Sequence, residues 1–310
     1  MTIHVLCLNP AIDKLYEIDG FTAGEDYPGQ QPGVQIGGKG VNVARVLSQL
    51  GADVHLYAFL GESGAEDFRR EMQPRCAGTF IPVPGACRTT VNIIDRISGQ
   101  ETVITEAGPR VDDAHVRQLM DALDAHVQPG DMVCCSGSII AGAPEDIYAK
   151  IAALSAKKGA ACALDCNAKA LPASLRGARY ALGKPNEREL CALLDQERTQ
   201  QPEALVRFAR RLIPPYDALL VSMGAAGGIW AEESCAYLAR MPHLQVVSTV
   251  GSGDAAFAGA LYALAERMTA PDALRMAMAC GAANAIRHET GSVRREDVMR
   301  IRNEIDIQSL

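Results

Sequence analysis

Short apolar runs alternate with segments of helical periodicity along most of this chain, and this alternation limits the folds that are open to it. Residues 3–8, 55–60 and 131–135 are predicted strands, and predicted helices at residues 40–50 and 111–125 lie between them. Strands that alternate with helices favour a parallel sheet with helices on both of its faces. The chain has 310 residues and 48% hydrophobic content, which is enough to bury the core of one large α/β domain.

Two stretches, residues 14–36 and 88–106, break this alternation. They are rich in Gly, Gln, Thr and β-branched residues and lack helical spacing. The second stretch contains a predicted hairpin that turns at Ser98 and Gly99. We predict that both belong to a small extra sheet that projects from a single domain spanning residues 1–310. The extra sheet acts either as a lid that keeps water from a reaction or as a plain surface hairpin.

The charge balance and the cysteines argue against several classes of protein. Thirty basic and 37 acidic residues give a net charge of −7, which argues against a nucleic-acid-binding protein. The ten cysteines include no Cys-x-x-Cys pair, and the closest pairs, Cys134-Cys135 and Cys162 with Cys166, lie in apolar runs. We therefore expect buried thiols, without zinc or disulfides. Such thiols, with neither an export leader nor an apolar run of about 18 residues, predict a cytoplasmic protein without a membrane partner.

The motif Gly251-Ser252-Gly253-Asp254 lies between a predicted strand at residues 245–249 and a predicted helix of small residues. Glycines allow a turn that directs several N–H groups toward one point, and the helix N-terminus adds a positive end, so the junction can bind an anion. A carboxylate would repel a phosphate there, but it could accept a proton from a hydroxyl that attacks a bound phosphoryl group. An ordinary tight turn with Asp254 as the helix N-cap is the alternative.

The same glycines fit the loose dinucleotide-binding fingerprint Gly-x-Gly-x-x-Gly/Ala, with Ala256 at its last position. That fingerprint requires a second strand that ends in an acidic residue about 20 positions later. Here one predicted helix runs to Arg267 and another begins near Asp272, with no β-rich run between them. The sequence therefore disfavours a dehydrogenase.

Two segments near the N-terminus carry groups that suit a sugar. Asn9 and Asp13 follow the first predicted strand, where ligands bind in α/β sheets, and a simple strand-to-turn exit is the alternative. Gly38, Lys39 and Asn42 lie where the next helix begins, so that Lys39 places a cation at the helix N-terminus. The spacing differs from that of a Walker loop, and a flexible turn is the alternative.

Three later segments suit a nucleotide and its metal ion. Asn186 and Glu189 share one face of a predicted first helical turn beside Lys184, so they either bind one hydrated Mg²⁺ or form a capping box. Residues 222–227 end a predicted strand in small side chains, as expected of a wall beside a nucleotide. Residues 281–285 are small enough for a flat base to approach. Core packing is the alternative for both.

Taken in order, these segments resemble the PfkB/ribokinase family of carbohydrate kinases over nearly the whole chain. GGKGVNVARVLSQLG is similar to the family's first signature, and STVGSGDAAFAGAL is similar to its second. LNPAID, KPNEREL and the segment around Arg88 resemble the branch that holds 1-phosphofructokinase and tagatose-6-phosphate kinase. The resemblance implies a ribokinase-like three-layer α/β sandwich with a mostly parallel central sheet and a small β-sheet lid. It also implies a homodimer formed through the lid.

The resemblance assigns a role to each motif. It implies that Asp254 is the catalytic base and that the amides of Gly251, Ser252 and Gly253 stabilise the transferring phosphoryl group. The residues that it assigns to the sugar phosphate are Asn9, Asp13, Gly38, Lys39, Asn42 and Arg88, with Arg88 on the existing phosphate. The residues that it assigns to ATP are Lys184, Asn186, Ser222, Gly224, Gly227, Thr249 and Asn284, and Mg²⁺ is assigned to Asn186 and Glu189.

Some positions depart from the pattern of this branch. Thr90 stands where the branch usually has Asn, residues 139–141 lack the usual Pro-Pro pair, and Ser252 and residues 105–109 resemble the tagatose-6-phosphate kinases. We expect a cytoplasmic kinase that uses ATP and Mg²⁺ to phosphorylate a hydroxymethyl group of a ketohexose monophosphate, converting fructose 1-phosphate to fructose 1,6-bisphosphate. Tagatose 6-phosphate is the alternative substrate. A non-catalytic sugar-phosphate sensor is the alternative from another class.

Overall fold

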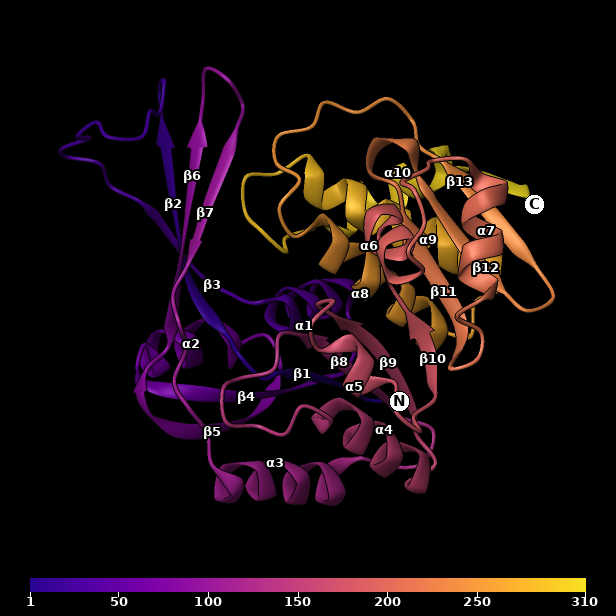
Figure 1. Ribbon diagram of the computed structural model, residues 1–310, viewed down its shortest axis with the longest axis horizontal. Coiled ribbons are helices and arrows are strands. Elements are labelled where there is room, and N and C mark those ends of the chain that lie inside the picture. The colour runs from indigo at the N-terminus through magenta and orange to yellow at the C-terminus, as the bar shows by residue number, and fades with distance from the viewer.

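The computed structural model describes residues 1–310 as two β-sheets, the larger of which is flanked by helices (Figure 1). The larger sheet has ten strands in the order β14-β13-β12-β11-β10-β9-β8-β1-β4-β5. Its parallel strands are, from one edge inward, β5 (Ala77–Ala86), β4 (Val54–Ser63), β1 (Ile3–Cys7), β8 (Met132–Gly137), β9 (Ala161–Cys166), β10 (Tyr180–Gly183) and β11 (Tyr216–Ser222). The antiparallel strands at the other edge are β12 (Gly228–Glu232), β13 (Ala236–Arg240) and β14 (Asp306–Ser309). The predicted, mostly parallel central sheet is confirmed.

Helices cover both faces of this sheet, as the sequence predicts. One face packs against α1 (Lys39–Leu50), α2 (Ala65–Met72), α8 (Ser252–Ala265), α9 (Ala270–Ala285) and α10 (Arg295–Glu304). The other packs against α3 (Asp113–His126), α4 (Ile147–Lys157), α5 (Leu171–Ser174), α6 (Glu187–Leu193) and α7 (Pro202–Arg210). Along β1, Val5 faces the first set and Leu6 the second, so the central strands are buried on both sides and have continuous apolar sequences. No helix in the structure combines the length and the apolar character that a membrane span requires.

A second, four-stranded sheet projects from this body as a narrow twisted extension, which we call the arm (Figure 1). Its strands run in the order β3 (Gly33–Gly37), β2 (Ala11–Ile18), β6 (Arg88–Asp95) and β7 (Glu101–Thr105). The predicted hairpin is confirmed, because β6 and β7 pair antiparallel and Asp95 accepts hydrogen bonds from Ser98 and Ile97 in the turn. Because β2 begins at Ala11, Asp13 lies on an arm strand, whereas the sequence prediction begins the extra sheet at residue 14.

Two edges of the fold differ from the sequence prediction. No strand forms at residues 245–249, where Val246 and Val247 are exposed and the N–H of Val247 donates to the carbonyl of Ala285 at the end of α9. This apolar run finds no sheet neighbour and remains a loop. Strand β5 is a strand that the sequence prediction does not include. It contains Pro82 and Pro84, which are tolerated because β5 is an edge strand.

Helix α8 has a composition that permits very close packing. It begins after Gly251, whose φ of 75° is left-handed, and no side chain caps its N-terminus. Its first turns consist mainly of buried alanines, and the helix packs against α1 and α9. Small side chains allow the backbones to approach, so the N-terminus of α8 lies deep in the body beside the start of α1.

Candidate active site

Charged side chains from several elements converge at the carboxyl edge of the parallel strands, where ligands bind in sheets of this kind. At their centre lies Asp254, on the first turn of α8, with 7% of its surface exposed. The Asp254 Oδ2 atom accepts a hydrogen bond of 2.9 Å from Nδ2 of Asn42 on α1. The structure therefore brings together two predicted site residues that are far apart in the sequence.

The buried position of Asp254 changes its acidity. Burial raises the pKa of Asp254 to about 6, the nearby ammonium group of Lys39 opposes this rise, and the carboxylate of Asp165 adds to it. The hydrogen bond from Asn42 and the charge of Lys184 also lower the pKa. A carboxylate with this pKa is ionised at neutral pH and accepts a proton more readily than an exposed aspartate does.

Asp165, which the motif analysis missed, joins two of the predicted site residues. It ends strand β9, and its carboxylate lies 3.2 Å from Nζ of Lys39 and 3.4 Å from Nζ of Lys184. Burial alone would raise the pKa of Asp165, but the two ammonium groups outweigh burial and lower it. The same carboxylate raises the pKa of Lys39. The sequence signal that could have identified Asp165 is a lone acidic residue at the end of an apolar run. Asn9 was identified in the same way, as a polar residue that follows a predicted strand.

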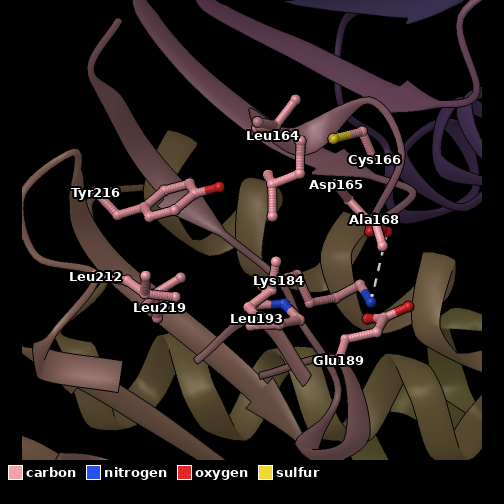
Figure 2. A pocket seen from close by; sticks show the side chains of 12 residues that line it. Leu164, Asp165, Cys166, Ala168, Lys184, Glu189, Leu193, Leu212, Tyr216 and Leu219 are labelled. Atoms are coloured by element: carbon pink, nitrogen blue, oxygen red, sulfur yellow. Dashed lines mark ion pairs between the residues drawn. The ribbon is translucent and has the colours of Figure 1, made fainter. Parts of the chain in front are cut away.

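Lys184 lies between this charge cluster and an apolar pocket. Figure 2 shows the pocket with Leu193, Leu212 and Leu219 in its wall and the ion pair between Lys184 and Asp165 as a dashed line. Its volume of about 30 Å³ is room for about two water molecules, so the pocket is too small for a nucleotide base. On its other side, Nζ of Lys184 lies only 3.3 Å from the position that a Cβ on Gly253 would take. The ammonium group is thus held against the first turn of α8.

Asn186 and Glu189 form the capping box that the sequence analysis gave as one of two alternatives. Oδ1 of Asn186 accepts a hydrogen bond of 2.8 Å from the N–H of Glu189, and Oε2 of Glu189 accepts one of 2.9 Å from the N–H of Asn186. The other oxygen of Glu189, Oε1, accepts no hydrogen bond from the protein. No group of three His, Cys, Asp or Glu side chains is arranged to hold a metal ion. The unbonded Oε1 of Glu189 fits a Mg²⁺ ion that would take most of its ligands from phosphates and water, as Mg²⁺ commonly does.

The residues assigned to the nucleotide lie along the same edge of the sheet. Ser222 ends β11 and forms a β-bridge with Asn186, and the exposed turn Gly224–Ala226 follows it. Thr249 is exposed, and its carbonyl accepts a hydrogen bond of 3.2 Å from the N–H of Ser252. Ser222, the turn with Gly224, and Thr249 therefore leave polar or backbone groups accessible.

Asn284 has a different position from the one that the sequence suggests. It is 1% exposed, and its Nδ2 donates to the carbonyl of Val250 at 2.8 Å and to Oγ of Ser252 at 3.0 Å. Its Oδ1 accepts a hydrogen bond of 3.2 Å from the N–H of Ser292. The amide therefore ties together the loops on either side of the α8 N-terminus, and its contact with a nucleotide stays a prediction.

A second cavity, of about 160 Å³, is lined by three of the six predicted sugar-phosphate residues, Asn9, Lys39 and Arg88, whereas Asp13, Gly38 and Asn42 do not line it. Only one of its eight lining residues is hydrophobic, and the polar ones include Asn9, Lys39, Arg88, Ser136, Ser138 and Asn167. Nε of Arg88 donates to the carbonyl of Asn9 at 3.1 Å, which leaves the outer end of the guanidinium available. Oδ1 of Asn9 and Oγ of Ser136 are buried and have no hydrogen-bond partner. Polar, cationic and partly unsatisfied walls suit a phosphorylated, hydroxyl-rich molecule.

Asp13 and Thr90 lie side by side at the base of the arm, because β2 and β6 pair in parallel. Burial raises the pKa of Asp13, while a hydrogen bond with Thr90 and the charge of Arg88 lower it in part. Thr90, which departs from the pattern of the branch, thus contacts a predicted sugar-binding carboxylate.

Comparisons with known proteins identify the family. The family model for pfkB family carbohydrate kinases matches residues 6–296 of the chain. The chain belongs to this pfkB family. Members are sugar kinases with an alcohol acceptor, so the chain is a kinase, and the sensor alternative finds no support.

Several pfkB proteins are similar to the chain over nearly its full length. A tagatose-6-phosphate kinase from Staphylococcus epidermidis is 29% identical over 308 residues, which cover 98% of this chain and 99% of that protein. The solved structure of phosphofructokinase-2 from Escherichia coli with substrates and products has a TM-score of 0.89 at 23% identity, covering 98% of this chain and 99% of that one. A Thermotoga maritima structure named "Possible 1-phosphofructokinase" has a TM-score of 0.84 at 22% identity and covers 100% of both chains. At these identities the structural likeness supports the ribokinase-like fold alone, which confirms the predicted fold class.

Proposed function

We propose that this pfkB-family kinase transfers the γ-phosphoryl group of ATP to a hydroxymethyl group of a ketohexose monophosphate. The position of Asp254 carries the proposal, because this buried carboxylate lies at the uncapped N-terminus of α8 and close to Lys39 and Lys184. The polar, cationic cavity that adjoins Lys39 receives the sugar phosphate. In this arrangement the reacting hydroxyl group of the sugar lies at the end of the cavity nearest α8, between Asp254 and the phosphoryl donor.

In this mechanism Asp254 accepts the proton of the attacking hydroxyl group. Its pKa of about 6 suits this role near neutral pH. The amides of Gly251, Ser252 and Gly253 bind the transferring phosphoryl group, since no side chain caps the N-terminus of α8; the N–H of Ser252 exchanges its hydrogen bond to the carbonyl of Thr249 for this contact. Lys184, held against Gly253, neutralises charge that develops on that group.

The nucleotide lies at the N-terminus of α8, on the side opposite the sugar. Lys184 contacts its phosphates, and the other residues that bind it are Asn186, Ser222, Gly224, Gly227, Thr249 and Asn284. Glu189 would hold the Mg²⁺ ion through Oε1, which accepts no bond from the protein, with Asn186 beside it. When bound, the ion neutralises phosphate charge and orients the phosphates for transfer.

The phosphate that the substrate already carries binds Arg88, because a guanidinium group can bind phosphate through two hydrogen bonds, and Lys39 holds the sugar nearer to Asp254. Fructose 1-phosphate and tagatose 6-phosphate both carry their phosphate at the end of the sugar opposite the reacting hydroxymethyl group, so the cavity suits either. Fructose 1-phosphate is our first candidate. Tagatose 6-phosphate is the second, favoured by the full-length similarity to the kinase from S. epidermidis.

An ADP-release assay tests the substrate. The enzyme is incubated with ATP and Mg²⁺ and, in turn, fructose 1-phosphate, fructose 6-phosphate, tagatose 6-phosphate, ribose and a nucleoside. We expect kcat/KM to be higher with the three sugar phosphates than with ribose or the nucleoside, because only a phosphorylated sugar engages Arg88, and to be highest with fructose 1-phosphate or tagatose 6-phosphate. Turnover of ribose or a nucleoside above that of every sugar phosphate would refute the proposed substrate class.

Arg88→Ala tests the phosphate subsite within the same assay. We expect the KM for the sugar phosphate to rise by about tenfold or more, because a charge-assisted contact is lost, with the KM for ATP unchanged. An unaltered KM for the sugar phosphate would remove Arg88 from the site.

We further propose that residues 1–310 form one kinase domain whose arm closes over the sugar and joins a second copy of the chain. Apolar side chains are exposed on the arm, among them Val34 at 62%, Val103 at 52% and Ile104 at 56%. A surface of this kind suits a homodimer contact. Light scattering of the wild type and of Val103→Lys tests it, and a monomeric wild type would contradict it. The ten free thiols suit a reducing compartment, and we place the enzyme in the cytoplasm.

A further inference from the structure

Arg45 on α1 is a buried arginine whose guanidinium group has every N–H engaged. It is 2% exposed and lies one helical turn after Asn42. Nε and Nη2 donate to Oε1 of Glu71 at 3.2 and 2.7 Å, and Nη2 also donates to the carbonyl of Ile36. Nη1 donates to Oδ1 of Asn42 and to the carbonyl of Thr290, each at 3.0 Å. Because all five N–H groups of this buried guanidinium donate hydrogen bonds, the groups that accept these bonds are held in one arrangement.

These bonds join four separate parts of the chain. Glu71 belongs to α2, Ile36 to arm strand β3 and Thr290 to the loop that follows α9. Two further bonds close the network: the N–H of Ile36 donates to Oε2 of Glu71 at 3.2 Å, and Nε2 of Gln35 donates to the carbonyl of Thr290 at 2.7 Å. Arg45 therefore links the base of the arm to the loop beside the N-terminus of α8.

The contact with Asn42 has a consequence for Asp254. A side-chain amide has a donor end and an acceptor end, and Arg45 supplies a donor to Oδ1 of Asn42. Nδ2 of Asn42 is therefore the end that faces Asp254, to which it donates at 2.9 Å. A flipped amide would set an oxygen against the carboxylate and an NH₂ group against the guanidinium. The amide also has little room to swing, because a Cβ on Gly291 would lie 2.8 Å from Oδ1 of Asn42.

We infer that Arg45 is a positioning residue for phosphoryl transfer: it fixes the Asn42 amide so that Nδ2 donates to Asp254 and holds that carboxylate in place. Arg45 does not touch Asp254 and acts only through Asn42. The inference rests on the proposed role of Asp254 as the base. Asn42 provides the single hydrogen bond that the Asp254 carboxylate accepts from the protein.

The charged groups that face Asp254 from other elements are Lys39 on α1, Asp165 at the end of β9 and Lys184 after β10. None of them contacts Arg45, so they stay in place when Arg45 is changed. Loss of the Asn42 bond alone then raises the pKa of Asp254, because that bond favours the ionised form. A base with a higher pKa becomes protonated at a higher pH, so the acid limb of the rate profile moves toward neutrality.

The test compares Arg45→Lys with the wild type. Lysine keeps the positive charge beside Glu71 but cannot bond Glu71, Asn42, Ile36 and Thr290 together. We expect kcat to fall by about tenfold, since a hydrogen bond to a charged group is lost, while the KM for ATP stays within about twofold. The acid limb of kcat/KM moves to higher pH. Arg70→Lys is the matched control, because Arg70 lies in an exposed ion pair on α2. We expect it to leave kcat and the acid limb of kcat/KM unchanged.

A double-mutant cycle separates positioning from a merely structural role. If Arg45 acts through Asn42, then Arg45→Lys in an Asn42→Ala background moves the acid limb no further. Additive effects, or an acid limb that does not move in Arg45→Lys, would overturn the inference. If Arg45→Lys does not fold, Glu71→Gln replaces it, because Glu71 is partly exposed, and the same shift at smaller size is expected.

A readout without turnover keeps this inference distinct from the proposed function. The Asp254 carboxyl group is titrated by ¹³C NMR in the full chain, with Asp254→Asn to assign its signal. An upward pKa shift in Arg45→Lys supports the positioning role even if the substrate assay fails. An unchanged pKa in a folded, active variant refutes the positioning role and leaves the kinase mechanism intact.

Discussion

The N-termini of α6 and α8 both lie at the active-site edge and both carry an acidic residue on the first turn, but they are built in opposite ways. In α6, Asn186 and Glu189 satisfy each other's backbone amides. In α8, no side chain caps the helix, and Asp254 is turned away to Asn42. The N–H groups of Gly251 and Gly253 therefore remain available for an anion, although that of Ser252 donates to the carbonyl of Thr249, whereas in α6 the protein itself uses the N–H groups of Asn186 and Glu189. The difference shows that similar residues at a helix start can serve stability in one place and chemistry in another.

The variant Asp254→Asn should have the largest effect, and it tests whether the N-terminus of α8 carries out the chemistry. We expect kcat to fall by about 10² to 10⁴, because a general base is lost, while ATP binding is nearly unchanged. Asp272→Asn provides a matched control, since Asp272 is an acidic residue on the first turn of the neighbouring α9. Turnover is followed by ADP release and ATP affinity by calorimetry. Persistent turnover in Asp254→Asn would show that another group accepts the proton.

Gly253→Ala sharpens the contrast, because its effects on stability and on activity should have opposite signs. Alanine should raise the free energy of unfolding by about 0.4–1 kcal/mol, since glycine is the more flexible residue in the unfolded chain. The added methyl lies 3.3 Å from Nζ of Lys184, where the phosphoryl group binds, and should lower kcat by about 10- to 100-fold. Gly33→Ala, on the arm, is the control for an added methyl group. Full activity in Gly253→Ala would place the phosphoryl group elsewhere.

The pH dependence of kcat/KM tests the raised pKa of Asp254 at the N-terminus of α8. With the pKa of Asp254 at about 6, kcat/KM should be nearly constant at neutral pH and fall about tenfold per pH unit below that value. The direction follows because the base acts only when it is ionised. An exposed aspartate would instead give a limb near pH 4. Observation of the lower limb in the wild type would contradict the raised pKa.

Two substitutions at α6 separate stability from metal binding, with the smallest expected effects. Glu189→Gln can keep the capping box and should leave stability almost unchanged, but it should raise the Mg²⁺ concentration for half-maximal activity by about tenfold. Asn186→Ala should lower the free energy of unfolding by about 1 kcal/mol, because an N-cap is lost. Urea unfolding and Mg²⁺ titration measure the two effects. An equal loss of stability in both variants, with no change in the Mg²⁺ requirement, would make α6 purely structural.

Most of the fold could be predicted because its signals are local. The buried parallel strands are short apolar runs, and the turn of the β6–β7 hairpin lies at Ser98 and Gly99 as expected. The failures depend on neighbours that the sequence does not show. Residues 245–249 have a strand composition but no partner strand, and Pro82 and Pro84 are acceptable only because β5 lies at an edge.

The candidate site was predictable where residues occur in motifs and not where single residues contribute. The positions of Asp254, Lys39 and Lys184 follow from glycine-rich or polar segments at helix starts. Asp165 is a lone carboxylate, and nothing before the fold shows that it lies between two lysines. Arg45 is likewise one charge on an otherwise amphipathic helix, and its partners lie on three distant segments.

The arm is assembled from two parts of the chain that elements of the body separate in the sequence. Its strands β2 and β3 precede α1, β4, α2 and β5, and its strands β6 and β7 follow them, so residues 38–87 lie between the two halves of the arm in the sequence. The arm strands are mostly half-buried or exposed, whereas β1 and β8 are fully buried, so we expect the amides of the arm to exchange with solvent well before those of β1 or β8. Substrate entry can draw on such local opening of the arm without loosening the strands that support the charged edge.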